Sequence, residues 1–212
     1  NTTMSRFALC DACQREYPDP LDRRYHAEPL ACPRCGPQVA LVAADPATLL
    51  ADARHDGTRA TADDVLARAV AALRAGATLA VKGVGGYHLM CDARSAPAVA
   101  QLRARKQRPD KPLAVMYPRS RGGADPLACL RDDVVLTDPE AAALLSAVRP
   151  IVVARRAAGC TLAPGIAPGL DEIGVLLPYS PLHEMLLGDF GGPLVATSGN
   201  LSGEPVITDP AM

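Results

Sequence analysis

Two Cys-x-x-Cys pairs stand out among the residues of this sequence that could do chemistry. The first pair is Cys10 and Cys13, and the second pair, Cys32 and Cys35, follows after eighteen residues. Four thiolates at this spacing can bind one Zn²⁺ in tetrahedral geometry at about 2.3 Å. A segment of this length has almost no apolar core, so the metal would supply much of its folding free energy. We therefore predict a structural zinc site; the alternatives are four unrelated reduced cysteines and a site shared with a further pair of ligands.

A basic stretch in the middle of the chain is the second candidate. Residues 103–113 read Arg-Ala-Arg-Lys-Gln-Arg-Pro-Asp-Lys-Pro-Leu, which places five cations beside one acid. The chain has 22 lysines and arginines in total, but only three of them are lysines, Lys82, Lys106 and Lys111. Lysine is the compact point charge that many phosphate sites use. We therefore expect a site for an anion such as phosphate; a solvated helix end is the alternative.

Two loops rich in glycine and small polar residues could complete such a site. Residues 82–88, Lys-Gly-Val-Gly-Gly-Tyr-His, let the backbone pass close to a ligand, although neither the P-loop nor the dinucleotide-binding pattern is present. Residues 197–203, Thr-Ser-Gly-Asn-Leu-Ser-Gly, offer neutral donors suited to phosphate oxygens or a ribose. An ordinary turn is the alternative for each loop, and His88 could equally be a core histidine.

Composition limits where such chemistry can lie. The chain has 212 residues, 49% of them hydrophobic, and a formal net charge of -1. A near-neutral chain is not expected to coat nucleic acid or to bind anionic membranes, so any phosphate site must be local. We find no apolar run long enough for a membrane span and no signal-peptide core, and we expect a cytoplasmic protein. Seven cysteines are an odd number and favour metal binding over disulfides, and both ends of the sequence look cut.

The elements that must position these residues follow from the hydrophobic pattern. We expect a metal module over 1–38, a linker over 39–60, and an α/β domain over 61–212 whose loops converge on one face of a twisted sheet. Helix starts are expected at Thr61, Ser95, Asp138 and Ser180. The first helix should end at Gly76, the second should run through Lys106 and be stopped by Pro109, and the third should run through Val148. Strands are expected over 39–43, 78–81, 112–117, 151–154, 173–177 and 193–196.

Several of these stretches together resemble one family, the carbamoyltransferase HypF of nickel-iron hydrogenase maturation. Residues 2–10, 16–17, 22–27 and 31–37 are similar to the second zinc finger of that family. Residues 82–93, 106–116, 177–183 and 197–205 are similar to its YrdC-like domain. The resemblance covers nearly the whole chain and is weakest in the linker and over 119–135. It implies an α/β (α+β) fold, a YrdC-like twisted mixed sheet with helices, preceded by a small zinc finger with four cysteine ligands.

The resemblance also implies an activity. In this family the YrdC-like module activates carbamate, derived from carbamoyl phosphate, with ATP and Mg²⁺, giving carbamoyl-adenylate and pyrophosphate. Two further domains, which this sequence does not contain, hydrolyse carbamoyl phosphate and modify the C-terminal cysteine of a partner protein. By matching position, Lys106 and Arg108 would hold the ATP phosphates, and Lys82 and His88 would face the carbamate. The residues that would line the nucleotide site are Thr197, Ser198, Asn200 and Ser202.

Adenylation fits these residue types. A carbamate oxygen attacks the α-phosphorus of ATP, so catalysis needs positioning and neutralisation of phosphate charge rather than a side-chain nucleophile. We therefore assign no nucleophilic role to Cys91, Cys129 or Cys160.

Two other functions are alternatives. Threonylcarbamoyl-AMP synthase of tRNA modification shares the Lys-x-Arg and Ser/Asn patterns, but it has Pro-Thr-Glu-Thr-Val-Tyr-Gly where this chain has residues 82–88, and an arginine where this chain has Leu176. The loss of polar groups suits a substrate smaller than a threonyl compound and leaves the role of Arg155 open.

The third interpretation is a module that binds double-stranded RNA through the zinc finger and a basic surface. An RNA affinity that depends steeply on salt, without ATP turnover, would favour it.

Overall fold

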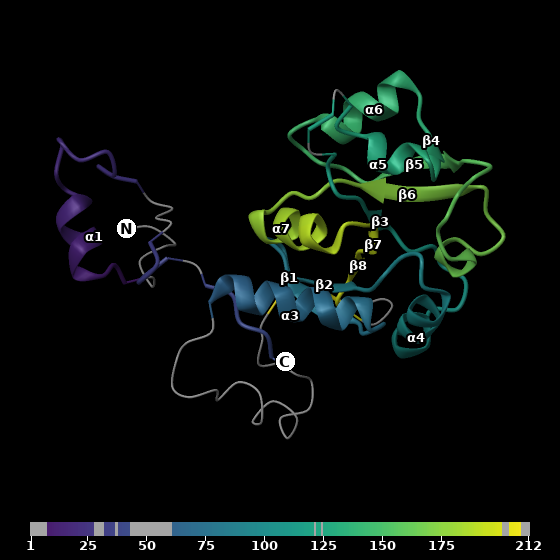
Figure 1. The fold of residues 1–212 in the computed structure, drawn as a ribbon, viewed down its shortest axis with the longest axis horizontal. Coiled ribbons are helices and arrows are strands. Elements are labelled where there is room, and N and C mark those ends of the chain that lie inside the picture. Colours follow the sequence, from purple (N-terminus) through teal and green to yellow (C-terminus); the bar gives the residue numbers. More distant parts are fainter. Residues whose placement is uncertain are drawn as a thin grey trace. The chain divides into compact units, whose positions relative to one another are not determined.

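The computed structural model describes residues 8–27, 32–36, 38–42, 61–120, 122–123, 125–200 and 204–208 (Figure 1). Its internal contacts divide the chain into two units, Asn1–Val65 and Leu66–Met212. The predicted limits at 38 and 60 stay a prediction, and most of the predicted linker, 43–60, lies outside the described residues. Among the residues described, no helix combines the length and the apolar character needed to cross a membrane.

Before residue 43, the described part of the first unit contains one short helix. α1 spans Asp11–Glu16, and its N-cap is Cys10 in extended conformation. Tyr17, Tyr25 and His26 stack beyond it, with ring centroids 5.1 Å and 4.1 Å from His26. The strand predicted over 39–43 is wrong for the part that is described, because residues 39–42 pair with no other strand.

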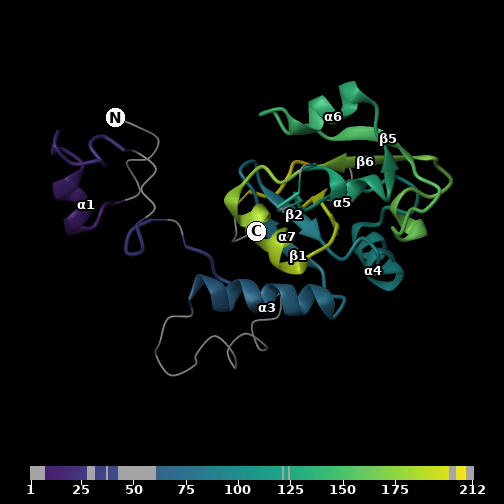
Figure 2. The same cartoon turned by 45° about the horizontal axis from the view of Figure 1, so that its top comes forward.

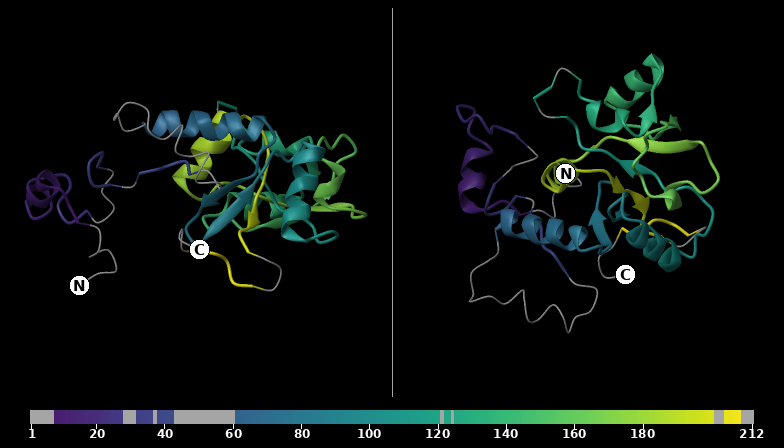
Figure 3. Two further views of the ribbon diagram at one scale, coloured as in Figure 1. Left: turned by 90° about the horizontal axis from the view of Figure 1, so that it is seen from below. Right: turned by 45° about the vertical axis from the view of Figure 1, so that its right-hand side comes forward.

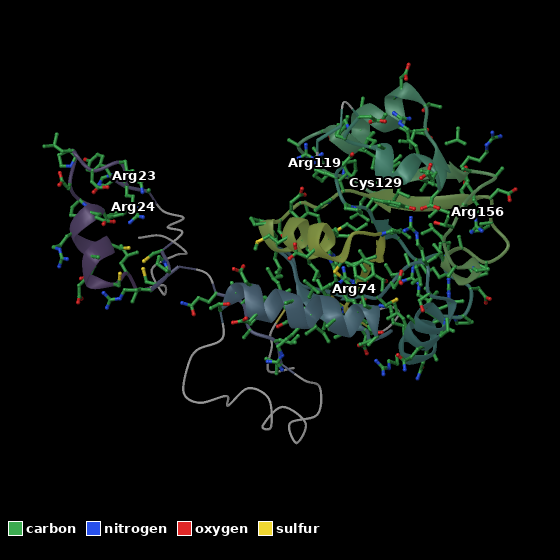
Figure 4. All side chains as sticks on the ribbon, in the orientation of Figure 1. Arg23, Arg24, Arg74, Arg119, Cys129 and Arg156 are labelled. Carbon is green, nitrogen blue, oxygen red and sulfur yellow. The ribbon has the colours of Figure 1, made fainter. Side chains whose placement is uncertain are left out.

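The helix that follows was predicted from its cap and its apolar spacing. α3 spans Ala62–Arg74, and the Thr61 hydroxyl accepts from Asp64 N at 3.1 Å while Asp64 accepts from Thr61 N. The apolar residues on one face of α3, Val65, Leu66, Ala69, Val70 and Leu73, are buried. At its end, Arg74 (Figure 4) donates to the backbone carbonyls of Asp189 and Phe190 in the last turn of α7 (Pro181–Phe190). A cation at that position satisfies carbonyls that lack a partner within α7.

Strands of the second unit form two sheets. The first has the order β1-β2-β8, with β1 Leu79–Lys82, β2 Tyr87–Met90 and β8 Thr197–Ser198, all antiparallel. The second has the order β4-β5-β6-β3-β7, and only its β3–β6 pair is parallel. Its strands are β4 Val134–Val135, β5 Val152–Arg156, β6 Glu172–Leu176, β3 Val115–Met116 and β7 Leu194–Val195. The mixed α/β fold class is confirmed.

The chain between β7 and β8 joins the two sheets. Asp92 bridges to Leu194, and Val195 N donates to Cys91 O at 2.8 Å, just after β2. Ala196 N donates to Ala114 O on the other side at 2.8 Å. After β8 the chain returns beside β2, where Tyr87 N donates to Ile207 O at 3.0 Å (Figure 3). Residues 194–198 therefore run from the five-stranded sheet, through β7, into the three-stranded sheet, through β8.

Helices cover the five-stranded sheet on two sides. α6 (Asp138–Leu145) packs against β5, and α5 (Ala128–Arg131) packs against β4. α6 and α7 (Pro181–Phe190) lie on opposite sides of β6 in both Figure 1 and Figure 2. α4 (Ala96–Lys106) packs against the 3₁₀ turn Pro164–Ile166. The main core includes Val99 and Leu102 of α4 and Val115, Ile173 and Val175 of the sheet, all almost wholly buried.

Several boundaries differ from the predictions. The predicted end of α4 at Lys106 is confirmed, but the helix stops because Gln107 adopts a left-handed conformation with φ of +50°, before Pro109 is reached. The strand predicted over 112–117 keeps only two paired residues, and α6 stops at Leu145 rather than Val148. Thr197 and Ser198, predicted as loop, are β8, because they pair with Leu89 and His88. α5 and β4 had no sequence prediction.

Candidate functional site

The four predicted zinc ligands come together in the first unit. The sulfur atoms of Cys10, Cys13, Cys32 and Cys35 all lie within 4.8 Å of one another. Cys10 Sγ and Cys32 Sγ are 3.9 Å apart, close to the edge of about 3.8 Å expected for a tetrahedron with metal–sulfur bonds of about 2.3 Å. Gly36 N donates to Cys32 O at 2.8 Å and closes the turn that carries the second pair. The grouping of these cysteines is confirmed, and the donor set fits Zn²⁺.

Backbone groups favour thiolate at two of these sulfurs. The N–H groups of Cys35 and Arg34 lower the pKa of Cys32 to about 6, and the N–H of Cys13 lowers the pKa of Cys10. Cys13 shows the opposite direction, because a side-chain hydrogen bond with Cys32 raises its pKa. Since the thiolate is the form that binds metal, the turn geometry already prepares part of the site.

Lys106 links the basic stretch, residues 103–113, to the loop that begins at Thr197 and includes Ser198 and Asn200, the Ser/Asn loop. Its side chain is only 4% exposed, and Nζ donates to Ser198 O at 2.5 Å and to Asn200 O at 2.9 Å. Burial, together with the charge of Arg108, lowers its pKa. A solvated helix end is therefore the wrong description of Lys106. An ammonium group has three donors, and the third has no partner among the residues described here.

Arg103 lies in the same stretch, for which an anion site was predicted, but its side chain binds backbone carbonyls of the protein instead. Its guanidinium is buried and donates to backbone carbonyls on two sides of the chain. The acceptors are the carbonyls of Gly165 (2.5 Å), Arg108 (2.7 Å), Pro109 (2.9 Å), Lys111 (3.2 Å) and Ile166 (3.2 Å). It therefore shapes the loop that carries Arg108. The signal in the sequence was its place on the face of α4 that also buries Val99 and Leu102.

Arg108 has unsatisfied donors. Its Nη2 donates to Pro112 O at 2.7 Å, but its Nε is buried and has no partner within the described part of the chain. Burial lowers its pKa, so the charge is partly removed from water. A buried N–H without an acceptor costs free energy, which an anionic oxygen would recover.

The Ser/Asn loop begins inside the sheet. Thr197 is only 6% exposed. The Ser198 hydroxyl donates to Asn200 Oδ1, and Asn200 Nδ2 donates to Glu204 O, both at 2.5 Å. A Cβ at Gly199 would lie 3.0 Å from Tyr87 O, so the glycine lets this loop approach β2. Ser202 lies outside the described residues.

Lys82 and the Lys106 group are not linked by hydrogen bonds within the described residues. Lys82 Nζ donates to Thr208 O and lies 5.3 Å from the centre of the Tyr87 ring. The structure thus brings together Lys106, Ser198 and Asn200 directly, with His88 beside Ser198 in the sheet. Lys82 lies at the turn end of the β1–β2 hairpin, opposite Tyr87, and β2 separates it from Ser198, which pairs with His88.

His88 belongs to a cluster that the sequence reasoning did not assemble. Its Nδ1 is 3.4 Å from Nε2 of His183, and the Tyr179 hydroxyl is 3.2 Å from His88 Nε2 and 3.3 Å from Nδ1. Burial lowers the pKa of both imidazoles, that of His183 to about 4 with a contribution from His88. Both shifts favour the neutral imidazole. The signal was present in residues 177–183, which carry the resemblance but had no site residue assigned.

Gly83 makes room for this cluster. A Cβ at position 83 would lie 3.0 Å from the Tyr179 hydroxyl and 3.5 Å from Cε1 of His183. This glycine is therefore required by side-chain packing within the protein, whereas a Cβ at Gly85 would meet nothing within 4 Å. The glycine-rich loop is a hairpin turn between β1 and β2, with Gly83 N donating to Gly86 O at 2.7 Å.

An open hollow of about 450 Å³ adjoins the cluster. Its lining includes Arg119, Arg149, Tyr179, Ser180 and Glu184. Arg119 follows β3 (Figure 4) and Tyr179 follows β6, and these two strands are parallel, so both lie at the carboxyl edge of the pair. Crevices at this edge of parallel strands are common ligand sites in α/β proteins.

Two cysteines of the second unit are not activated. Cys91 is fully buried, which raises its pKa to about 12, and burial also raises the pKa of Cys160. Neither sulfur is a thiolate at neutral pH, in agreement with the absence of a nucleophilic role in the sequence prediction.

Comparison with known families agrees with both units. Residues 9–42 match the family described as HypF finger, and residues 71–212 match the Sua5/YciO/YrdC family, described as Telomere recombination. Carbamoyltransferase HypF of Rhodobacter capsulatus is 49% identical over 207 residues, which are 97% of this chain and 25% of that protein. Threonylcarbamoyl-AMP synthase of Vibrio cholerae is 32% identical over 142 residues, 66% of this chain and 73% of that enzyme.

A solved structure extends the agreement to three dimensions. Full-length HypF in its phosphate- and nucleotide-bound form superposes with a TM-score of 0.78 at 38% identity, covering 99% of this chain and 25% of that one. The chain spans about a quarter of the length of the HypF relatives that it matches. With a HypF finger followed by a Sua5/YciO/YrdC domain, and with similarity over almost all its residues, the chain belongs to the HypF carbamoyltransferase family.

Proposed function

We propose that the second unit of this chain activates carbamate with ATP. A carbamate oxygen attacks the α-phosphorus, pyrophosphate leaves, and carbamoyl-adenylate forms; carbamoyl phosphate is the source of the carbamate. The observation that carries this proposal is the buried Lys106, held between two carbonyls of the Ser/Asn loop and close enough to Arg108 for their charges to interact. Two desolvated cations beside neutral donors are suited to a triphosphate.

The residue roles are part of the proposal. Lys106 and Arg108 hold the phosphates, Arg108 through the buried N–H that lacks an acceptor among the described residues. Lys82 and His88 face the carbamate. The nucleotide is lined by Thr197, Ser198, Asn200 and Ser202. Mg²⁺ would neutralise phosphate charge, and the phosphates themselves would supply most of its ligands.

The wider reaction is also proposed. In a longer protein of this family, the adenylate would pass its carbamoyl group to the C-terminal cysteine of a partner in [NiFe]-hydrogenase maturation. The finger, over residues 1–38, holds Zn²⁺ as a structural metal, and the adenylating domain covers 61–212. The reaction belongs in the cytoplasm, where the four ligand thiols stay reduced.

Threonylcarbamoyl-AMP synthesis is the alternative enzyme activity. The relative of that name from Vibrio cholerae supports the shared fold and nucleotide chemistry. Leu176 and the packed cluster at Gly83, however, favour an acyl substrate smaller than threonylcarbamate. Binding of double-stranded RNA is the non-enzymatic alternative.

ATP–pyrophosphate exchange tests the proposal. We expect exchange that depends on carbamoyl phosphate or carbamate, and none that depends on threonine with bicarbonate. Lys106→Ala and Arg108→Ala should each weaken ATP binding by about 10- to 100-fold, the worth of a charged hydrogen bond. Arg105→Ala is the matched control, because Arg105 is exposed on the same helix. Unchanged ATP affinity in both variants, or salt-sensitive RNA binding without exchange, would contradict the proposal.

A further inference from the structure

The side chains of Ser180, His183 and His88 lie in a row, each within hydrogen-bonding distance of the next or close to it. Ser180 is the N-cap of α7, and its hydroxyl accepts from His183 N at 3.3 Å. The same hydroxyl is 2.8 Å from Nδ1 of His183, and Nε2 of His183 is 3.4 Å from Nδ1 of His88. Each nitrogen of the buried His183 therefore faces one polar neighbour.

The helix cap is compatible with one direction of hydrogen bonding along this row, which is the direction proposed below. The Ser180 oxygen uses one of its two lone pairs to accept the backbone N–H, and in this direction it donates its own proton to Nδ1 of His183, which lies within reach. A neutral imidazole that accepts at Nδ1 carries its proton at Nε2. Nε2 of His183 is thus the donor toward His88, whose Nδ1 becomes an acceptor. His88 then carries its own proton at Nε2.

The packing around the rings leaves His183 little freedom. It is fully buried, and the close approach of Gly83 and Tyr179 confines its ring edge. His88 is only half-buried, and the Tyr179 hydroxyl, which lines the hollow of about 450 Å³, lies 3.2 Å from its Nε2 and 3.3 Å from its Nδ1. The ring edge of His88 that carries Nε2 is thus beside a group that lines the hollow.

We propose that His183 is a positioning residue for His88: it holds the His88 imidazole in the tautomer with Nδ1 as acceptor and Nε2–H as donor, offered to an oxygen of a small carboxylate-like substrate. The inference rests on the proposed function for the identity of that substrate. The carbamate oxygen loses negative charge as it attacks the phosphorus. A neutral N–H donor suits this change, because its hydrogen bond to the oxygen does not require an ion pair to be broken during the reaction.

Histidine tautomers can be measured directly on the 212-residue chain. Long-range ¹H–¹⁵N NMR spectra of the imidazoles near neutral pH distinguish Nδ1–H from Nε2–H, and a His88→Ala sample assigns the signals. We expect His88 to be more than about tenfold enriched in the Nε2–H form, as a difference of one hydrogen bond implies. In His183→Ala that enrichment should largely disappear. In His183→Gln, where the amide N–H can replace Nε2–H, it should be restored.

Ser180→Ala provides a second variant that leaves the His183 ring in place. Without the hydroxyl, Nδ1 of His183 loses its donor, and both histidines should become mixtures of tautomers. A wild-type His88 protonated at Nδ1 would overturn the proposal. So would an unchanged His88 tautomer in both His183→Ala and Ser180→Ala.

A kinetic arm separates this inference from the proposed function. In the exchange reaction, Ser180→Ala should raise KM for carbamate by about tenfold, the worth of one hydrogen bond, and leave the Kd for ATP close to that of wild type. The tautomer spectra need no nucleotide. A wild-type chain that binds no ATP therefore contradicts the proposed function while the positioning of His88 is still tested. A Ser180→Ala variant that loses ATP affinity and carbamate affinity equally contradicts the positioning role.

Discussion

Lys106 Nζ donates to the backbone carbonyl of Ser198 at 2.5 Å, which ties the end of α4 to the first residues of the Ser/Asn loop. A phosphate ligand entering this place would meet an ammonium that is already fixed in direction. The loop, in turn, depends on the lysine for its position. Binding and local stability are therefore coupled at this residue.

Replacing Lys106 should affect both properties. In Lys106→Ala the carbonyls of Ser198 and Asn200 lose their donor, so we expect the free energy of unfolding to fall by about 1–3 kcal/mol in addition to the loss of ATP affinity. Urea denaturation and titration calorimetry measure the two effects. Arg105→Ala should change neither, and a Lys106→Ala variant with wild-type stability would contradict this coupling.

Arg103 and Arg108 should separate structure from binding. Arg103→Ala removes five hydrogen bonds to backbone carbonyls, and we expect it to cost about 2–4 kcal/mol of stability. Arg108→Ala removes one such bond and a buried N–H without an acceptor among the described residues, so its stability should stay within about 1 kcal/mol of wild type. Chemical denaturation of both variants checks the ranking, and the reverse order would show that the roles are exchanged.

Two glycines of one turn offer a paired test of packing. Gly83→Ala places a methyl group 3.0 Å from the Tyr179 hydroxyl and should cost about 1–3 kcal/mol while displacing Tyr179 from His88. Gly85→Ala meets no atom within 4 Å and should be close to neutral. Thermal unfolding compares the two, and equal stability of both variants would be inconsistent with the described contact.

Zinc removal should affect only the first unit. Cys32→Ser should lower the zinc content and loosen residues 8–42, because the cysteines form almost all of the small core there. The second unit has its own core and should keep its structure. Metal analysis and amide hydrogen exchange measure both, with Cys129→Ser as the control. Full protection of residues 8–42 in a strong chelator would mean that the metal is not structural.

His183 should make the fold sensitive to acid. Its pKa is lowered from 6.5 to about 4 in the folded chain, so the unfolded state binds more protons between these values. Stability should therefore be unaffected by this group above pH 6.5 and fall as the pH drops from 6.5 to 4, by up to about 3 kcal/mol. His183→Gln should flatten this part of the profile. An unchanged slope in denaturation experiments across this pH range would disprove the assignment.

Local signals in the sequence predicted local structure well. The Thr61–Asp64 cap and the apolar spacing behind it define α3, and Ser180–Pro181 defines the start of α7. The zinc ligands were found because four cysteines in two close pairs have few other uses. Gln107 gave no such signal, since a glutamine with positive φ is stabilised by its surroundings rather than by its own preference.

Contacts between distant segments were beyond such reasoning. Arg103 and Arg108 are the same residue type in the sequence. Only the fold shows that the donors of Arg103 are bonded to backbone carbonyls, whereas Arg108 Nε has no acceptor among the described residues. The pairing of His88 with His183 depends on how β2 lies against α7, across 95 residues of chain. The predicted strands 112–117 and 193–196 contain β3 and β7, but β8 has only two residues and is too short to show an alternating pattern.

The segment 194–198, which runs from the five-stranded sheet into the three-stranded sheet, has a mechanical consequence. Neither sheet can slide past the other without breaking the bonds of Val195 to Cys91 or of Ala196 to Ala114. A force applied where the Ser/Asn loop begins is thus transmitted into the larger sheet. The second unit should therefore unfold in one cooperative step rather than one sheet at a time.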